Sequence, residues 1–448
     1  MIVFPFGKAA FSILLLTILA WAALAFDNRR PDKPSTLTYW TFTKEHYDNY
    51  KKLIPEFEKT HPGVTVDLQL VSNNALASRL QAAFLADLDV PDICELEIGS
   101  AGTMFRGPVK DIGFIDLKPR LVQSGLYDRI VKARFAPYTS RGEIFGLPHD
   151  VHPVQIAYRR DIFEQCGVDP DKIQTWDDFV RAGQKVTIPG KRYMIELSDS
   201  DVYGGGLETL LLQRGGGYFD PGGHVIFDND TAVQAMEAYV PMVAGPKKIG
   251  NTVGDQYGAQ FAKALEDGYE VCVLCPDWRS HVIQDNVAHV AGKMALMPLP
   301  AAEVGGRRTS TWGGTMLGIT KHCKHQDIAW QLAVFLYTNR EQIDQAFPNV
   351  NILPPIKDAW TVPSINKPNA YWSNQKLGTS YAKLAPEVPA QYTSPEIDTA
   401  KAQLSNALIS CVRYYNDRGD DAGFDPFVRS TLHKSAARVR TVIARNPY

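Results

Sequence analysis

Short apolar runs that alternate with helical patterns are the feature of this sequence that most restricts its fold. "STLTYWTF" at 35–42 alternates like a strand, and residues 45–60 place apolar side chains at helical spacing. "HPGVTVDLQLV" at 61–71 then begins with a Pro-Gly turn and continues as a second strand. A β-α-β opening of this kind is typical of a sheet covered by helices, so we predict an α/β fold.

The length of the chain adds a second restriction. Single hydrophobic cores stop growing near about 250–300 residues, so 448 residues predict two lobes. With 45% apolar and 21% charged residues the composition is that of a globular protein. A net charge of −2 provides no strong field to attract polyanions, which argues against nucleic acid as a partner.

The first 26 residues differ from the rest of the chain. Lys8 precedes an apolar run at 9–26, which contains the small-x-small triplet that ends at Ala25. This pattern predicts a signal peptide at 1–25 and export to the periplasm. The alternative is a retained membrane anchor, because an 18-residue run lies at the lower edge of spanning length. The sequence does not decide whether the segment is cleaved.

Six cysteines are too few and too scattered to predict a disulfide framework. Cys272 and Cys275 have CxxC spacing, but a zinc site would lack half of its ligands. Their surroundings, "GYEVCVLCPDW", are typical of a buried strand, so we interpret both as core residues. Their disulfide state stays open.

His149 and Asp150 in "LPHDVHPV" could be a catalytic pair, a metal-binding pair or part of a connector. Adjacent residues of an extended segment point to opposite sides, which disfavours a shared metal, and no nucleophile is apparent nearby. The flanking prolines suit an extended connection. We therefore predict that this segment crosses between the lobes, and a hydrogen bond from it to a ligand remains possible.

Several stretches, in a fixed order, carry a resemblance to a known family. They are "STLTYWTF", "LIPEFEKTHPGVTVDLQ", "ADLDVPDICELE", "IFGLPHDVHPVQIAYRRDIFEQCGVDPDKIQTWDDFVRAGQKV", "LEDGYEVCVLCPDW" and "STWGGTMLGITKHCKHQDIAWQLAVFLYT". Together they resemble the extracellular solute-binding proteins of bacterial ABC importers, the branch typified by maltose- and other sugar-binding proteins. The likeness runs over about residues 36–345, and it rests on the order of the stretches rather than on any single motif.

The resemblance implies a two-lobed periplasmic-binding-protein fold, type II-like, with hinge crossings and a ligand cleft between the lobes. The implied first lobe comprises residues 36–148 and 292–345. The implied second lobe comprises residues 149–291 and 346–448. It further implies that the chain has no catalytic residues, no metal site and no cofactor.

Sugar recognition needs flat aromatic faces and planar polar groups in a concave site. Residues of both kinds fall on loops after predicted strands, where the resemblance places the cleft. The aromatic candidates are Trp40, Tyr218, Trp278 and Trp312, and the polar candidates are Glu97, Asp150, Asp277 and Arg279. Because arginine binds carboxylates bidentately, Arg279 leaves both a neutral and an acidic ligand open.

The function that the resemblance implies is capture of a carbohydrate-like solute and its delivery to the membrane permease of an ABC transporter, by a protein that we expect to be a monomer. One alternative is an exported glycan-active enzyme, which would need two carboxylates across a cleft. Glu95, Glu97, Asp150 and Asp277 are candidates for such a pair, but no motif assigns them roles. Another alternative is a ligand sensor that docks a membrane receptor. The sequence does not identify the ligand.

Overall fold

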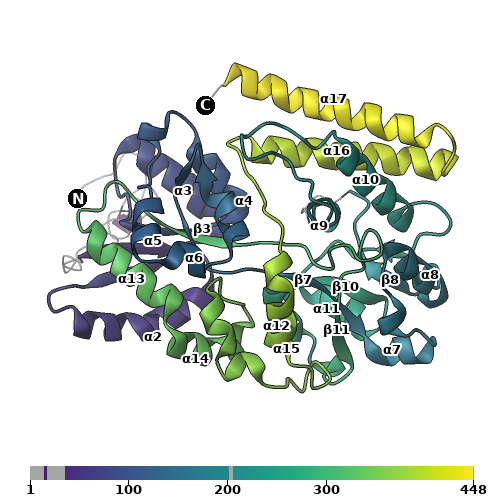
Figure 1. The fold of residues 1–448 in the computed structure, drawn as a ribbon, viewed down its shortest axis with the longest axis horizontal. Coiled ribbons are helices and arrows are strands. Elements are labelled where there is room, and N and C mark those ends of the chain that lie inside the picture. Colours follow the sequence, from purple (N-terminus) through teal and green to yellow (C-terminus); the bar gives the residue numbers. More distant parts are fainter. Residues whose placement is uncertain (1–14, 18–35, 201–204, 447–448) are drawn as a thin grey trace, which may run out of the picture.

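The computed structural model describes residues 15–17, 36–200 and 205–446, and two five-stranded sheets form the centres of two lobes. Figure 1 shows the lobes side by side. Nearly all of the predicted signal segment, residues 1–14 and 18–25, lies outside the described residues. The α/β expectation is confirmed.

The first sheet has the strand order β2-β1-β3-β12-β6. β1, β2 and β3 are parallel, as the β-α-β pattern predicts, and β12 is antiparallel to both β3 and β6. The strands are β1 (Leu37–Thr41), β2 (Val66–Leu70), β3 (Ile93–Glu97), β6 (Leu147–Pro148) and β12 (Thr315–Ile319). β12 therefore returns to this sheet from far along the chain, which makes the first lobe discontinuous.

Helices cover both faces of the first sheet because its strands are apolar on both sides. Tyr39 packs in the core formed with α2 and α13, and its neighbour Trp40 packs on the opposite face in the core formed with α3. These helices are α2 (Lys44–Thr60), α3 (Asn73–Ala86) and α13 (Gln326–Thr338), and α14 (Arg340–Val350) follows directly. The Thr43 side chain caps α2 by accepting a hydrogen bond from the backbone N–H of His46.

The second sheet has the order β11-β7-β10-β8-β9. β7 is antiparallel to β10 and β11, whereas β8 runs parallel to both β10 and β9. The strands are β7 (Val154–Arg159), β8 (Tyr193–Glu196), β9 (Gly250–Asn251), β10 (Glu270–Pro276) and β11 (Met294–Pro298). Every residue of β7 and β10 is buried, consistent with a sheet covered on both faces.

One face of the second sheet carries the largest hydrophobic core, and the other carries a smaller one. The larger core includes residues of the two long C-terminal helices, which lie antiparallel along one edge of the molecule in Figure 1. Its helices are α8 (Trp176–Val186), α9 (Gly206–Gln213), α10 (Asp230–Val243), α16 (Ile397–Arg418) and α17 (Phe424–Arg445). The helices on the other face are α11 (Ala259–Glu266), α12 (Asp277–Asn286) and α15 (Leu377–Leu384), and short helices α4 (Ile98–Ala101), α5 (Lys118–Gln123), α6 (Leu126–Arg129) and α7 (Arg160–Gln165) complete the fold.

The structure also decides the state of the cysteines. Cys272 packs on the face of β10 that contacts the larger core, and Cys275 packs on the opposite face. Both are buried free thiols, and burial raises the pKa of Cys275 to about 12. Because their side chains point to opposite faces of one strand, they form neither a disulfide nor a shared metal site.

The boundary expected at residue 292 differs from the structure. β11 belongs to the second sheet, where Met294 pairs with Arg159 and Pro298 with Gln155. The chain therefore reaches the first sheet only at Thr315. The physical reason is that β11 buries side chains on both faces, so it completes the edge of the second sheet beside β7.

Candidate ligand site between the lobes

Three segments of the chain connect the lobes and lie side by side. The first contains His149 and Val151, the second runs through 309–315, and the third contains Leu353. Backbone hydrogen bonds join them: His149 N donates to Thr315 O at 2.9 Å, and Val151 N donates to Leu353 O at 3.1 Å. The predicted crossing at His149–Asp150 is thus one of three connections that form the hinge.

A buried arginine ties two of the connections to the first lobe. The Arg134 guanidinium donates to Asp150 Oδ1 at 2.9 Å, to Thr311 Oγ1 at 2.8 Å and to Gly313 O at 3.0 Å. Asp150 Oδ2 in turn accepts from Thr315 N at 2.9 Å. Asp150 therefore holds the first and second connections together.

His152 extends this network into the second lobe. Its Nε2 lies 3.1 Å from Asp150 Oδ2, and its Nδ1 lies 2.5 Å from Asp277 Oδ1. Asp277 Oδ2 accepts from Leu353 N at 2.7 Å, and this hydrogen bond joins the third connection to the network. Burial opposes protonation of His152, but the charges of Asp150 and Asp277 outweigh it and raise its pKa to about 9. We call Arg134, Asp150, His152 and Asp277 the hinge cluster.

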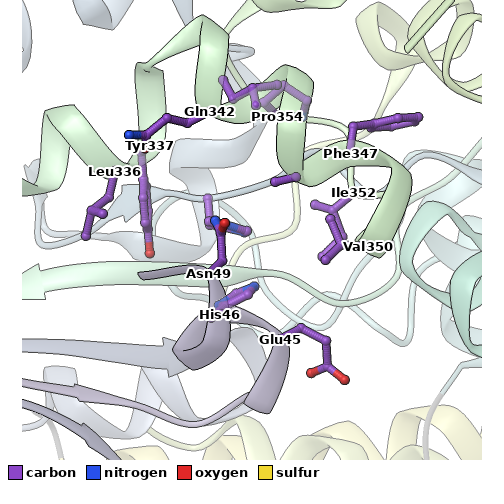
Figure 2. Close-up of a pocket in the computed structure, with 13 residues that line it drawn as sticks. Glu45, His46, Asn49, Leu336, Tyr337, Gln342, Phe347, Val350, Ile352 and Pro354 are labelled. Carbon is purple, nitrogen blue, oxygen red and sulfur yellow. The ribbon is translucent and has the colours of Figure 1, made fainter. Parts of the chain in front are cut away.

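A pocket lies beside the hinge between α2, α13 and α14, and Figure 2 shows His46 and Asn49 facing side chains of α14 across it. His46 Nδ1 lies 3.0 Å from Glu95 Oε2, and the hydroxyls of Tyr50 and Tyr337 donate to Glu95 Oε1. Burial acts to raise the pKa of Glu95, but His46 lowers it to about 2. Glu95 is therefore a buried structural anion and does not face the opposite lobe.

Three aromatic rings group on the second lobe. Trp278 and Trp312 form a T-shaped pair with ring centroids 5.7 Å apart, and Tyr257 lies 5.7 Å from Trp278. Trp278 Nε1 donates to Trp312 O at 3.0 Å, which fixes one ring against the second connection. Tyr257 is 43% exposed, and Trp312 belongs to the second connection, in which Gly314 O accepts from Ile98 N of the first lobe at 2.8 Å. The aromatic group therefore faces the interface between the lobes.

Glu97 supplies a carboxylate from the first lobe. It ends β3, and its Oε2 accepts from Gly99 N at 2.7 Å, which caps α4. Burial raises the pKa of Glu97, although Lys401 on α16 of the second lobe opposes the rise. Glu97 and Lys401 therefore bring charged groups of the two lobes close together.

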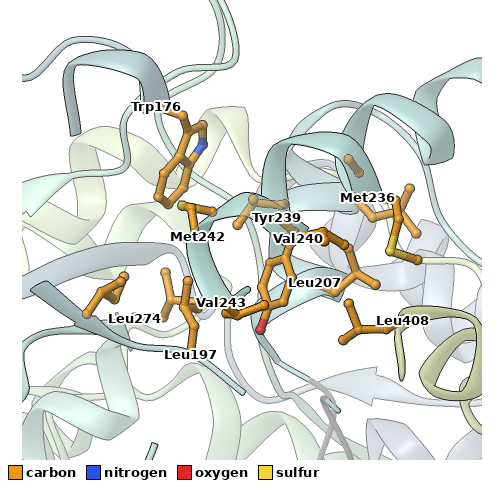
Figure 3. Close-up of a cluster of buried hydrophobic side chains, with 14 of the residues drawn as sticks. Trp176, Leu197, Leu207, Met236, Tyr239, Val240, Met242, Val243, Leu274 and Leu408 are labelled. Atoms are coloured by element: carbon orange, nitrogen blue, oxygen red, sulfur yellow. The ribbon is translucent and has the colours of Figure 1, made fainter. Parts of the chain in front are cut away.

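A small cavity lies beside Trp312 in the second lobe. Its walls are Glu196, Leu197, Ser198, Gly206, Thr252, Gln256, Leu274, Arg279 and Trp312. Figure 3 shows Leu197 and Leu274 at the edge of the large hydrophobic core. Arg279 Nη2 donates to Glu196 Oε2 at 2.7 Å and to Gln256 O at 3.0 Å, and Nη1 donates to Leu274 O at 3.0 Å.

The structure places the predicted site residues in different surroundings. Trp278 and Trp312 pack together, and Arg279 lines the cavity beside Trp312. Glu97 pairs in the first sheet with Thr315, at the end of the second connection. Asp150 and Asp277 are buried, and the contacts of the hinge cluster engage both oxygens of each.

Trp40 and Tyr218 differ from the expectation. Trp40 is 2% exposed and packs in the core under α3, and Arg79 lies over its ring at 4.1 Å. Tyr218 is 4% exposed and packs in the large core of the second lobe. Both side chains stabilise a lobe because neighbouring helices cover the faces on which they lie.

Sequence reasoning missed Glu196, Tyr257, Gln256 and Lys401. A signal existed for Glu196, because a charged residue ends the otherwise apolar strand "YMIE". Tyr257 and Lys401 carried no such signal, since their segments reach the interface only through tertiary packing.

Within the described part of the chain, no group of three or more His, Cys, Asp or Glu side chains could hold a metal ion. Among the helices of that same part, none is long and apolar enough to span a membrane.

Comparison with solved structures agrees with this architecture. The sugar-binding protein MalE from Xanthomonas citri gives a TM-score of 0.74 at 19% identity, covering 91% of this chain and 99% of that one. A binding protein from B. animalis subsp. lactis Bl-04, solved with β-1,6-galactobiose, gives a TM-score of 0.65 at 18% identity, covering 90% and 97%. These likenesses confirm the expected two-lobed fold.

Sequence comparison adds two named relatives and a family. An arabinooligosaccharide-binding protein of Bacillus subtilis (strain 168) is 28% identical over 371 residues, covering 82% of this chain and 84% of the relative. A lactose-binding protein of Rhizobium radiobacter is 26% identical over 300 residues, covering 64% and 69%. The family model described as bacterial extracellular solute-binding protein matches residues 43–343, which is more than half of the chain. On that match, the protein belongs to the bacterial extracellular solute-binding proteins.

Proposed function

We propose that this protein is the substrate-binding component of an ABC importer and that it captures a carbohydrate between its lobes. The observation that carries the proposal is the T-shaped pair of Trp278 and Trp312 beside the second connection, with Glu97 of the first lobe paired to Thr315 at the end of that connection. Aromatic faces suit the C–H surfaces of sugar rings, and a carboxylate accepts hydrogen bonds from hydroxyls. Relatives named for arabinooligosaccharide and lactose binding support the same class of ligand.

Capture would work by lobe closure about the three connections. A ligand that contacts both lobes binds the closed form more tightly than the open form, so it shifts the population toward closure. The hinge cluster keeps the connections in register during this motion. The membrane permease would then recognise the closed form and receive the ligand.

The carboxylates considered for glycan cleavage have other partners. Glu95 is enclosed by tyrosine hydroxyls and His46, and Asp150 and Asp277 belong to the hinge cluster. Of the four candidates, this leaves only Glu97, so the set supplies no pair of carboxylates for cleavage. The proposal is therefore binding without chemical turnover. It includes residues 1–25 as a signal peptide, a periplasmic location and a monomeric state.

A thermal-shift screen of the purified protein tests this function. Mono- and oligosaccharides, sugar acids, polyols and glycerol phosphodiesters form the panel, and each is analysed for chemical change afterwards. A ligand that binds only the folded state raises the melting temperature by mass action. A saturable rise with an intact carbohydrate supports the proposal. Cleavage of the ligand would favour an enzyme, and a rise with non-carbohydrates alone would reject the sugar assignment.

A further inference from the structure

The cavity beside Trp312 lies where three strands of the second sheet end. Glu196 is the last residue of β8, Asn251 ends β9 and Pro276 ends β10, and these strands are parallel. Ligands of α/β sheets bind at the carboxyl ends of strands. The cavity therefore occupies the position at which this sheet can present side chains to a ligand.

Three polar atoms of the cavity residues are buried and lack a hydrogen-bond partner among the described residues. They are Glu196 Oε1, Gln256 Oε1 and Arg279 Nε. Leaving a buried donor or acceptor unpaired is unfavourable, so native proteins rarely contain several such atoms together. Two acceptors and one donor beside an aromatic ring match a group that both donates and accepts, as a hydroxyl does.

The charges around the cavity balance. Arg279 forms an ion pair with Glu196, and its Nη1 and Nη2 also donate to the carbonyl oxygens of Leu274 and Gln256. Glu270, behind Glu196 on β10, is buried, and burial together with the charge of Glu196 raises its pKa to about 8, so it is mostly uncharged at neutral pH. An anionic ligand would lose its hydration here without meeting an unpaired cation.

We infer that this cavity is a specificity pocket that takes an uncharged, hydroxyl-bearing end of the ligand, with Glu196 and Gln256 as hydrogen-bond acceptors, and that it excludes acidic sugars. The inference rests on the proposed function and deepens it. It resolves the choice that Arg279 left open in the sequence, because the charge of the guanidinium is already paired with Glu196 and only its Nε–H is left without a partner among the described residues.

The first test uses the unaltered protein. Isothermal titration calorimetry compares neutral disaccharides with derivatives that carry a carboxylate at the non-reducing or the reducing end. We expect the neutral sugar to bind at least about tenfold more tightly than both acids, a ratio equivalent to about 1.4 kcal/mol. Equal or tighter binding of the acidic form would overturn the inference while leaving the carbohydrate function intact. If no sugar in the panel binds, the proposed function fails and the inference fails with it.

The second test uses one substitution and a matched control. Gln256→Leu removes one acceptor while keeping the bulk, and Gln345→Leu makes the same change on the exposed face of α14. We expect Gln256→Leu to weaken binding of the neutral sugar about tenfold and Gln345→Leu to leave it unchanged, with both melting temperatures close to that of the unaltered protein. An unchanged affinity in Gln256→Leu would show that the ligand does not enter the cavity.

Glu196→Gln should change the ligand preference of the cavity from neutral toward acidic sugars. The substitution preserves the shape of the side chain but leaves the Arg279 cation unpaired, so the preference should move toward acidic sugars. We expect the neutral-to-acidic affinity ratio to fall at least about tenfold relative to the unaltered protein. Because this readout is a ratio within one variant, a general loss of stability does not imitate it. An unchanged ratio would contradict the role of Glu196.

Discussion

Arg106 of the first lobe lies 2.8 Å from the carboxylate of Glu396, which precedes α16 of the second lobe. The same guanidinium reaches Pro395 O at 3.3 Å. This contact joins the lobes at a place separate from the hinge. It indicates that the C-terminal helices serve the second lobe and also hold it against the first.

Gly102 lies next to this contact and permits the lobes to approach. A Cβ atom there would lie 2.2 Å from Thr393 Oγ1 and 2.6 Å from Ser394 O. We predict that Gly102→Ala disfavours closure by about 1–3 kcal/mol, the usual cost of overpacking, and weakens ligand binding about tenfold or more. Calorimetry measures the affinity, and small-angle scattering should show a larger radius for the ligand-bound variant. Ser100→Ala, two residues earlier in α4, is the control, and equal affinities in the two variants would contradict this prediction.

Trp278 should contribute to binding more than to stability, because its ring is only partly buried at the lobe interface. We predict that Trp278→Ala weakens ligand binding and changes the melting temperature of the ligand-free protein little. Trp176→Ala is the comparison, since Trp176 lies in the large core (Figure 3) and is 4% exposed. That substitution should cost about 3–5 kcal/mol of folding free energy. A comparable loss of stability in Trp278→Ala would make Trp278 a core residue.

His152 should stabilise the protein in a pH-dependent way. Its pKa in the folded protein, about 9, is raised above the unfolded value near 6.5. The stabilisation is therefore fully present below about pH 6.5 and is lost as the pH rises through 9. We predict that His152→Gln lowers the free energy of unfolding more at pH 6 than at pH 9.5. Denaturant titrations at both values measure the difference, and a difference independent of pH would refute the assigned protonation.

Glu270 should also make the protein less stable as the pH rises, but over a different pH range. Its folded pKa of about 8 lies above the ordinary value of 4.5, so its neutral form is favoured in the folded protein. The associated stability is present below about pH 4.5 and is lost as the pH rises through 8. Glu270→Gln keeps the neutral shape, and we predict that it stabilises the protein relative to the parent increasingly from pH 5 to pH 8. Melting curves across this range provide the measurement, and a constant offset would count against the prediction.

The elements with strong local signals were predictable. Thr175 and Asp178 form a capping box at the start of α8, as the run "TWDDF" indicates, and Trp176 is buried beside it. The crossing at His149–Asp150 was also predictable, because prolines flank an extended segment between two apolar patterns. Such features depend on neighbours in the sequence, so local chemistry is enough to indicate them.

The composition of the site was predictable only in part. Trp40 lies next to the end of β1, as a cleft residue would, but its ring packs with Leu76 and Leu80 of α3. β11 was placed in the wrong lobe because an apolar run does not reveal which sheet edge it completes. The ion pair of Arg279 with Glu196 joins residues 83 positions apart in the sequence, so no local pattern predicts it.

The sequence by itself determined the α/β class, the two lobes, the family and the existence of a connector at His149–Asp150. Hydrophobic periodicity, chain length and the order of motifs indicate these features, and all three depend only on the order of the residues. Only the tertiary structure decided that Asp150 and Asp277 serve the hinge, that Glu95 is enclosed, and that Arg279 is engaged by Glu196. Burial and pairing of charged groups depend on which distant segments pack together. That packing sets the desolvation and the partner of each charge, and hence its role.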